Sequence, residues 1–172
     1  MRLTLLMKCL PLLLFIASTV GSCSKDDKKT EDVSATRRSW VSGTWKQKDL
    51  VLAYPIDFAG QQLPVGFSIY NITSYLPVSG PDIDCTKNNT YTFNADNSYT
   101  ISGCTSLMLP KAGNAGKWGL EVYDAVIRLT SSDNKTAPYW TNSLTENTWS
   151  IGLTLYVAEA DANIPVNLLL EK

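Results

Sequence analysis

The chain of 172 residues contains no histidine, and this absence excludes most of the familiar catalytic and metal sites. Ser-His-Asp triads, Cys-His pairs and histidine-based zinc sites all need an imidazole. A glycine-rich phosphate-binding loop is missing as well. Two acids, Asp82 and Asp84, could in principle serve calcium or glycoside hydrolysis, but acids beside a turn proline are more often solvated loop charges. We therefore expect no enzyme activity, no cofactor and no metal.

The chain also has no excess of basic charge. Fifteen Lys and Arg stand against sixteen Asp and Glu, and the basic count falls to thirteen once Arg2 and Lys8 are removed with the N-terminal segment discussed next. Binding to nucleic acid phosphates needs a basic surface. We therefore expect no nucleic-acid partner.

A long hydrophobic run is absent too. The apolar segment 9–20 is shorter than the roughly 20 residues that a membrane-spanning helix needs. It follows the basic residues Arg2 and Lys8 and ends in Gly21 and Ser22, directly before Cys23, which is the pattern of a cleaved bacterial lipoprotein signal peptide. We predict that residues 1–22 are removed and that Cys23 carries acyl chains, so that the membrane is one partner of this protein.

The residues after Cys23 bear on where the protein is anchored. Lys25, Asp26 and Asp27 resemble the export signal of Bacteroidota lipoproteins, which implies an outer-membrane protein that faces the cell surface. We predict that residues 23–38 form the acylated cysteine and a flexible charged tether. In the alternative interpretation the charges only keep the folded domain off the membrane, whatever their sequence. In that case the protein could instead face the periplasm.

Few cysteines remain after this processing. Cys9 leaves with the signal peptide and Cys23 is acylated, which leaves Cys85 and Cys104 to form a disulfide in an oxidising compartment. A reactive or metal-binding thiol pair is the alternative, although no histidine or third cysteine is available to complete it.

A hairpin lies between these two cysteines. Tyr91 and Phe93 alternate with polar residues, as do Tyr99 and Ile101, around the turn 94–97. We predict that Phe93 pairs with Tyr99 and Tyr91 with Ile101. Cys104 then has the wrong parity to meet Cys85, so a bulge at Gly103 or irregular backbone near Cys85 is needed.

The rest of the chain from residue 39 reads as one β domain. Apolar residues recur at every second position over 118–122, 125–129, 149–157 and 164–170, and 138–144 is a shorter candidate. The last two long runs predict a C-terminal hairpin. No window shows helical spacing. Such strands form an antiparallel meander whose sheet must close or stack, which assigns residues 39–172 to one domain.

The pattern changes over 53–84, where prolines and glycines are mixed with aromatic residues. Residues 67–73 are a possible strand. The remainder is either a cover over one end of the barrel or part of its wall.

The segment Gly43-Thr44-Trp45 resembles the first strand of lipocalins, in which the tryptophan closes the narrow end of the barrel. The two cysteines flanking 91–99 and the segment 116–118 are similar to those of small lipocalin-like lipoproteins of Bacteroidota. This resemblance implies an all-β, up-and-down antiparallel meander that closes into a barrel of about eight strands. Typical lipocalins stack an arginine of the last strand on that tryptophan, and here only Lys172 could replace it.

The resemblance implies a barrel but leaves its role open, because fold does not determine function. In one interpretation the barrel binds a small apolar or amphipathic ligand at its mouth, using residues among Phe58, Phe67, Tyr70, Tyr139 and Trp140. In the other, the barrel is filled by its own side chains and acts as a surface interaction or accessory module of an outer-membrane complex.

Overall fold

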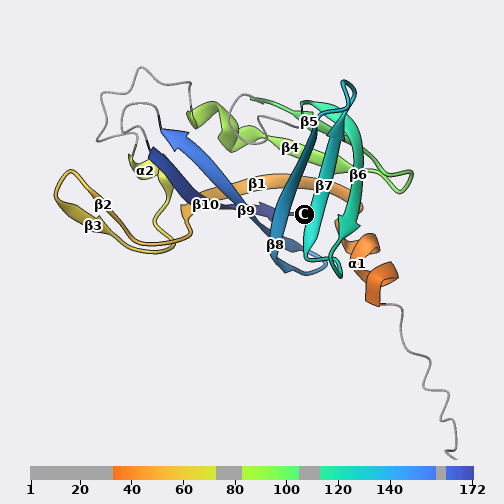
Figure 1. Ribbon diagram of the computed structural model, residues 1–172, viewed down its shortest axis with the longest axis horizontal. Helices are drawn as coiled ribbons and strands as arrows, with labels where there is room; N and C mark the ends of the chain where they lie inside the picture. The colour runs from red at the N-terminus through yellow and green to blue at the C-terminus, as the bar shows by residue number, and fades with distance from the viewer. Residues whose placement is uncertain (1–32, 73–82, 105–112, 158–161) are drawn as a thin grey trace, which may run out of the picture. The chain divides into compact units, whose positions relative to one another are not determined.

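Eight antiparallel strands close into a barrel in the computed structural model, which describes residues 33–72, 83–104, 113–157 and 162–172 (Figure 1). Around the barrel the strands run in chain order, and the last pairs with the first. This confirms the predicted all-β barrel. The strands are β1 (Gly43–Leu52), β4 (Thr90–Phe93), β5 (Ser98–Ser102), β6 (Ala115–Glu121), β7 (Val126–Ser131), β8 (Thr136–Leu144), β9 (Thr148–Val157) and β10 (Ala162–Glu171).

The two predicted hairpins form with the expected registers. In β4 and β5, Phe93 lies opposite Tyr99 and Tyr91 opposite Ile101. The turn between them places Asn97 in the left-handed region, with φ of 65°, a conformation that asparagine tolerates. The β9–β10 hairpin pairs ten residues on each strand, from Ala162 opposite Val157 to Glu171 opposite Thr148. Alternation of period two therefore located these elements correctly.

The insertion between β1 and β4 does not join the barrel wall. Its described residues form a separate two-stranded sheet of β2 (Ile56–Phe58) and β3 (Gln61–Leu63), then helix α2 (Ile69–Ile72) and a 3₁₀ helix, η1 (Ile83–Asn88). The predicted strand over 67–73 is therefore wrong. After one isolated bridge from Ser68 to Val51, the N–H of Asn71 donates to the carbonyl of Ser68, which turns the chain into α2.

Helix α1 (Val33–Val41) lies at one end of the barrel, within the segment that the sequence assigns in part to a flexible tether. Arg37 donates to the carbonyl of Asp124 at 3.3 Å, and the guanidinium of Arg38 lies 5.3 Å from the centre of the Trp118 ring. Residues 33–38 are thus helical and attached to the domain. Hydrophobic periodicity could not reveal this helix because Val41 is its only buried residue. No helix among the residues placed by the structure is long and apolar enough to cross a membrane.

Aromatic side chains fill the end of the barrel next to α1. Trp45 is fully buried, its ring centre lies 5.5 Å from that of Trp149, and its indole N–H donates to the carbonyl of Val41 at 2.8 Å. Phe93 packs against Trp149 and Trp118 at centroid distances of 5.3 and 5.9 Å. These contacts are within the range of favourable edge-on and tilted ring packing. We call this aromatic end the closed end.

Lys172 lies over Trp45 at the closed end, where typical lipocalins have an arginine. Its ammonium lies 4.5 Å from the centre of the Trp45 ring and donates to the carbonyls of Trp40 and Ser42 at 2.6 and 3.0 Å. Gly43 has φ of +127°, and a Cβ there would lie 3.3 Å from the Cε of Lys172. The glycine of Gly-Thr-Trp is therefore explained both by its backbone and by the lysine above it.

The barrel wall separates along two lines as it runs away from the closed end. β1 pairs with β4 only over Gly43–Lys46, although β1 continues to Leu52. β8 pairs with β9 only as far as Trp140 opposite Gly152, although β9 continues to Val157. We call these two separations the β1/β4 seam and the β8/β9 seam. In Figure 1 the β9–β10 hairpin leans away from β7 and β8.

Candidate functional site

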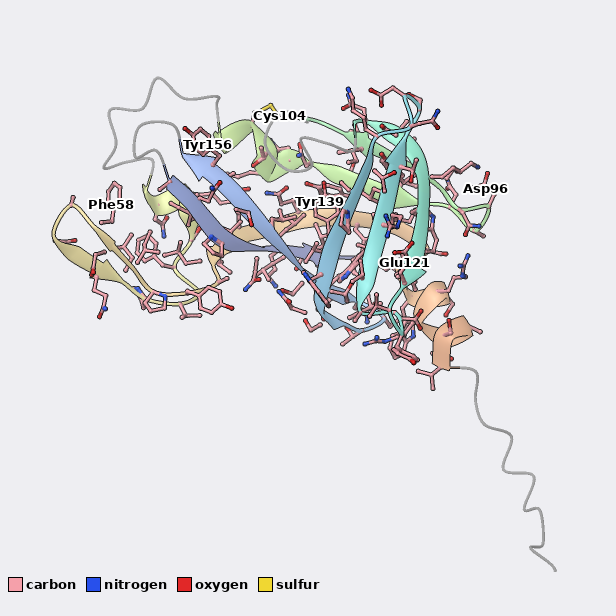
Figure 2. The ribbon with its side chains drawn as sticks, viewed as in Figure 1. Phe58, Asp96, Cys104, Glu121, Tyr139 and Tyr156 are labelled. Carbon is pink, nitrogen blue, oxygen red and sulfur yellow. A yellow bond between two sulfur atoms is a disulfide. The ribbon has the colours of Figure 1, made fainter. Side chains whose placement is uncertain are left out.

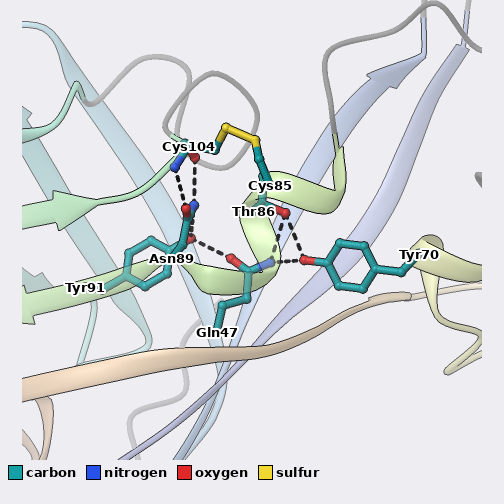
Figure 3. Close-up of a disulfide and its surroundings, with 7 residues drawn as sticks. All are labelled: Gln47, Tyr70, Cys85, Thr86, Asn89, Tyr91 and Cys104. Atoms are coloured by element: carbon teal, nitrogen blue, oxygen red, sulfur yellow. Dashed lines mark hydrogen bonds between the residues drawn. A yellow bond between two sulfur atoms is a disulfide. The ribbon is translucent and has the colours of Figure 1, made fainter.

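The β1/β4 seam is closed by a network of buried polar side chains (Figure 3). Gln47 of β1 lies at its centre. The hydroxyl of Tyr91 donates to the Gln47 side-chain oxygen at 2.9 Å, and the Gln47 amide donates to the hydroxyls of Tyr70 and Thr86. The Tyr70 and Thr86 hydroxyls are themselves 2.9 Å apart. Since each polar group has a partner, this network joins β1 to η1 and α2 without leaving buried groups unsatisfied.

The disulfide between Cys85 and Cys104 lies next to this network and attaches η1 to the segment after β5. Cys85 of η1 and Cys104 after β5 are bonded, with Cα atoms 5.7 Å apart. Asn89 makes two hydrogen bonds of 2.7 Å with the backbone of Cys104, one through each end of its amide. Gly103 has φ of +112°, and a Cβ there would collide with Asn89. Of the two alternatives predicted from the sequence, irregular backbone near Cys85 is present as η1, whereas the β4–β5 pairing has no bulge and Gly103 instead follows β5 with positive φ.

The tyrosines of this network are poor candidates for chemistry. Burial raises the pKa of the Tyr91 hydroxyl well above its ordinary value of 10, and burial also raises the pKa of Tyr70. Both groups therefore stay protonated at physiological pH. The network acts as a structural closure of the β1/β4 seam.

The β8/β9 seam has a cavity in place of such a network. The cavity measures about 630 Å³ and is lined by residues of β1, β8, β9 and β10 and by the two residues that follow β1. This volume is in the range of small-molecule sites, roughly 300–1,000 Å³. The lining residues are Leu50, Ala53, Tyr54, Thr136, Ala137, Pro138, Tyr139, Trp140, Asn142, Gly152, Leu153, Thr154, Leu155, Pro165, Val166 and Asn167.

Both faces of the strands contribute residues to the cavity. Ala137, Leu155 and Val166 belong to the buried core and supply an apolar inner surface. Trp140 is 61% exposed and Asn142 bonds to Asn167 at 2.7 Å on the exposed side. A molecule that entered here would meet an apolar interior and a polar, partly aromatic rim.

Tyr139 and Trp140 lie on opposite faces of β8 and therefore line different parts of the cavity. Tyr139 is opposite Ile127, which is buried, so its side chain points inward, toward the barrel interior in Figure 2. Trp140 lies opposite Gly152, where the absence of a side chain leaves space beside the indole. Burial raises the pKa of the Tyr139 hydroxyl above its usual 10.

The other predicted ligand residues lie elsewhere. Phe58 is on β2, the Phe67 carbonyl accepts a hydrogen bond from the N–H of Leu52, and Tyr70 belongs to the polar network. None of the three lines the cavity. The structure thus brings together Tyr139 and Trp140 but separates both from the aromatic residues of the insertion.

Several other sequence expectations concern residues outside the described parts of the chain. These are the lipidation site Cys23, the export-signal residues Lys25, Asp26 and Asp27, and Asp82 of the acid pair. Within the described ranges, no cluster of three or more Cys, Asp or Glu residues could hold a metal ion.

The aliphatic lining of the cavity was not predicted as a site. Leu155 and Val166 have the alternation of ordinary core residues, and nothing in that pattern shows that β8 leaves β9 beside them. Pro138 was the available signal, because a proline is tolerated in a strand where its missing N–H needs no partner.

No protein-family model matches this chain, and a comparison with curated protein sequences finds no significant relative. The candidate site therefore stands on its geometry alone.

Proposed function

We propose that the barrel binds a small amphipathic ligand in the cavity of the β8/β9 seam. The observation that carries this proposal is the asymmetry of the barrel. Its closed end is filled by Trp45, Trp149 and Phe93, whereas its other half contains the cavity of about 630 Å³. Leu155 and Val166 offer contact area for an apolar body, and the rim around Asn142 suits a polar end.

Filling the cavity tests this function directly. Leu153 is half-buried and lines the cavity, so Leu153→Trp should occupy much of the space and weaken the binding of a probe such as decanol at least tenfold. Ile164→Trp is the matched control, because Ile164 is half-buried on the same hairpin but does not line the cavity. Isothermal titration calorimetry of both variants measures the effect. Equal loss in the two variants, or no loss in either, would contradict the proposal.

Native mass spectrometry of protein isolated from its own host is the complementary experiment. A bound small molecule in stoichiometric amount would support the carrier role and give its mass. If Leu153→Trp protein from the same host carried that molecule too, the cavity would not be its site.

We further propose that the protein is a non-catalytic lipoprotein, anchored through acylated Cys23 and exposed on the outer membrane. This proposal is supported by the leader, the small residues before Cys23 and the charged residues Lys25 to Asp27. Cys23→Ser should move the protein from the membrane fraction to the soluble fraction. Protease treatment of intact cells then distinguishes the surface from the periplasmic face.

A second candidate function is an interaction module, favoured by the turn between β6 and β7. Tyr123 is 99% exposed and Val122 is 59% exposed, at the closed end of the barrel. Val122, Tyr123 and Asp124 all have positive φ, of 51°, 55° and 64°. Strained backbone that presents apolar side chains to solvent is a feature of binding turns. If this turn binds an outer-membrane partner, Tyr123→Asn should abolish its cross-linking in cells while ligand binding by the cavity is unchanged.

A further inference from the structure

We propose that the ligand of the β8/β9 cavity is electrically neutral and accepts a hydrogen bond from the hydroxyl of Tyr139. This inference rests on the proposed binding function and specifies the chemical class of the ligand. It excludes fatty acids, phospholipids and amines as the principal occupants.

The first argument is the absence of charge in the lining. None of the sixteen described residues that line the cavity is Asp, Glu, Lys or Arg. A carboxylate or ammonium group transferred from water into such a site would lose its hydration without gaining an ion pair. A hydroxyl, ester or amide group would lose much less, because single hydrogen bonds can replace its water.

The second argument is that the neighbouring charges are already paired. Arg128 of β7 lies opposite Pro138, on the outward face, and its guanidinium forms a two-bond contact with the Glu121 carboxylate. Lys135, just before β8, has its ammonium 2.7 Å from the Asp133 carboxylate. An ionic ligand would therefore have to compete with an existing partner for either cation.

The third argument concerns the donor. Tyr139 lines the cavity and points into the barrel, and no hydrogen bond joins its hydroxyl to any residue that the structure describes. No described side chain buries a polar atom without a partner, so this half-buried hydroxyl reaches solvent and can exchange water for a ligand acceptor. Since burial raises the pKa of this hydroxyl, it keeps its proton at neutral pH and can donate.

The backbone along the seam favours a small molecule over an added strand. The N–H of Thr141 donates to the carbonyl of Ala125, so the alternate residues Thr136 and Pro138 direct their backbone groups toward β9. Pro138 has no N–H there. A strand inserted between β8 and β9 would lose that ladder bond, whereas a small ligand does not need it.

The test uses three probes with the same alkyl chain: decanol, decanoate and decylammonium. At neutral pH only decanol is uncharged, and we expect calorimetry to show that it binds at least ten times more tightly than either ion. Tyr139→Phe should weaken decanol binding about fivefold, the usual effect of one neutral hydrogen bond. Tyr123→Phe, at the exposed turn far from the cavity lining, is the matched control and should change nothing.

The possible outcomes distinguish failure of this inference from failure of the proposed cavity binding. If decanoate or decylammonium binds as tightly as decanol, and Leu153→Trp still abolishes binding, the cavity binds ligands but is not selective for neutral ones. If Tyr139→Phe binds decanol as well as the native protein does, the assignment of the donor is overturned. If none of the probes binds, the cavity-binding function fails and this inference fails with it.

Discussion

The carboxylate of Asp133 lies in the turn between β7 and β8, where it is bound from two sides. The Lys135 ammonium is 2.7 Å away, and the hydroxyl of Ser131 donates to the other oxygen. Lys135 first, and then Ser131, lower the pKa of Asp133 from an ordinary 3.8 to about 2. Because the pKa is lower in the folded state, this group favours folding above about pH 4 and loses that contribution as the pH falls toward 2.

Removing this carboxylate should therefore change how stability depends on pH. Asp133→Asn should be less stable than the native protein at neutral pH, and the difference should shrink as the pH falls from about 4 to about 2. Urea unfolding midpoints across this range measure it. Lys135→Met removes the main cause of the pKa shift and should reduce the same difference. A gap between native protein and Asp133→Asn that stays constant down to about pH 2 would contradict this account.

Single residues also show why some local features could be predicted and others could not. An irregularity at Gly103 or near Cys85 was predicted, because Cys104 has the wrong parity to meet Cys85 on a regular hairpin. Lys172 was anticipated as the replacement for an arginine above Trp45, since it alone was available. By contrast, the positive φ of Val122 has no sequence signal, because β-branched residues rarely adopt this conformation. Only the tight connection between β6 and β7 imposes it.

At the scale of elements, the disulfide determines how η1 is attached to the barrel. It joins η1 to the segment after β5 across a sequence separation of 19 residues. Asn89, which follows η1, bonds both to Cys104 and, through its carbonyl, to the N–H of Gln47 on β1. The cross-link therefore supports the polar network that closes the β1/β4 seam.

Replacing both cysteines by serine should lower the free energy of unfolding by about 3 kcal/mol, the value expected for a loop of this size. Urea unfolding followed by tryptophan fluorescence measures it. The native protein in reducing agent provides the control and should lose a similar amount. If decanol binding by the double variant is unchanged under conditions where it remains folded, the two seams act independently. An unchanged unfolding midpoint would show that the cross-link contributes nothing to stability.

The hairpins were predictable because their evidence is local: alternating residues on either side of a turn specify both strands and register. The short helices were not. α2 follows from one hydrogen-bonded turn after Ser68, and α1 buries only Val41, so neither produces a hydrophobic stripe. The seams begin where β1 stops pairing with β4 after Lys46 and where β8 stops pairing with β9 at Trp140, and periodicity alone does not locate these points.

On the scale of the whole folded domain, aromatic side chains fill the closed end of the barrel, and the cavity lies toward the other end. Alternation predicted a sheet that closes or stacks, and the lipocalin resemblance implied closure, but only the tertiary arrangement shows where the strands separate and hence where the cavity lies. Two of the sixteen lining residues, Tyr139 and Trp140, were nevertheless predicted, since they are adjacent aromatic residues that follow Pro138 in β8. Phe58, Phe67 and Tyr70 were misleading because aromatic composition does not distinguish a ligand contact from packing beneath an insertion.

At the closed end, Lys172 contacts residues that are far from it in the sequence. Its ammonium binds the carbonyls of Trp40 and Ser42 at the end of α1 and lies over Trp45 of β1. Lys172→Met keeps the aliphatic stem but removes the charge, so it should lower the free energy of unfolding by about 1 kcal/mol. Lys172→Arg should retain most of this stability, because a guanidinium can donate to the same carbonyls and stack on the indole.

The readout for these two variants can separate local from global effects. Urea unfolding reports the stability of the barrel, and hydrogen exchange of the α1 amides reports whether the helix stays attached. We expect Lys172→Met to increase exchange in α1 while decanol affinity stays unchanged, because Lys172 does not line the cavity. Equal exchange in Met and Arg variants would show that the cation does not hold the helix. Reduced decanol affinity in Lys172→Met would instead show that the closed end influences the open one through the strands they share.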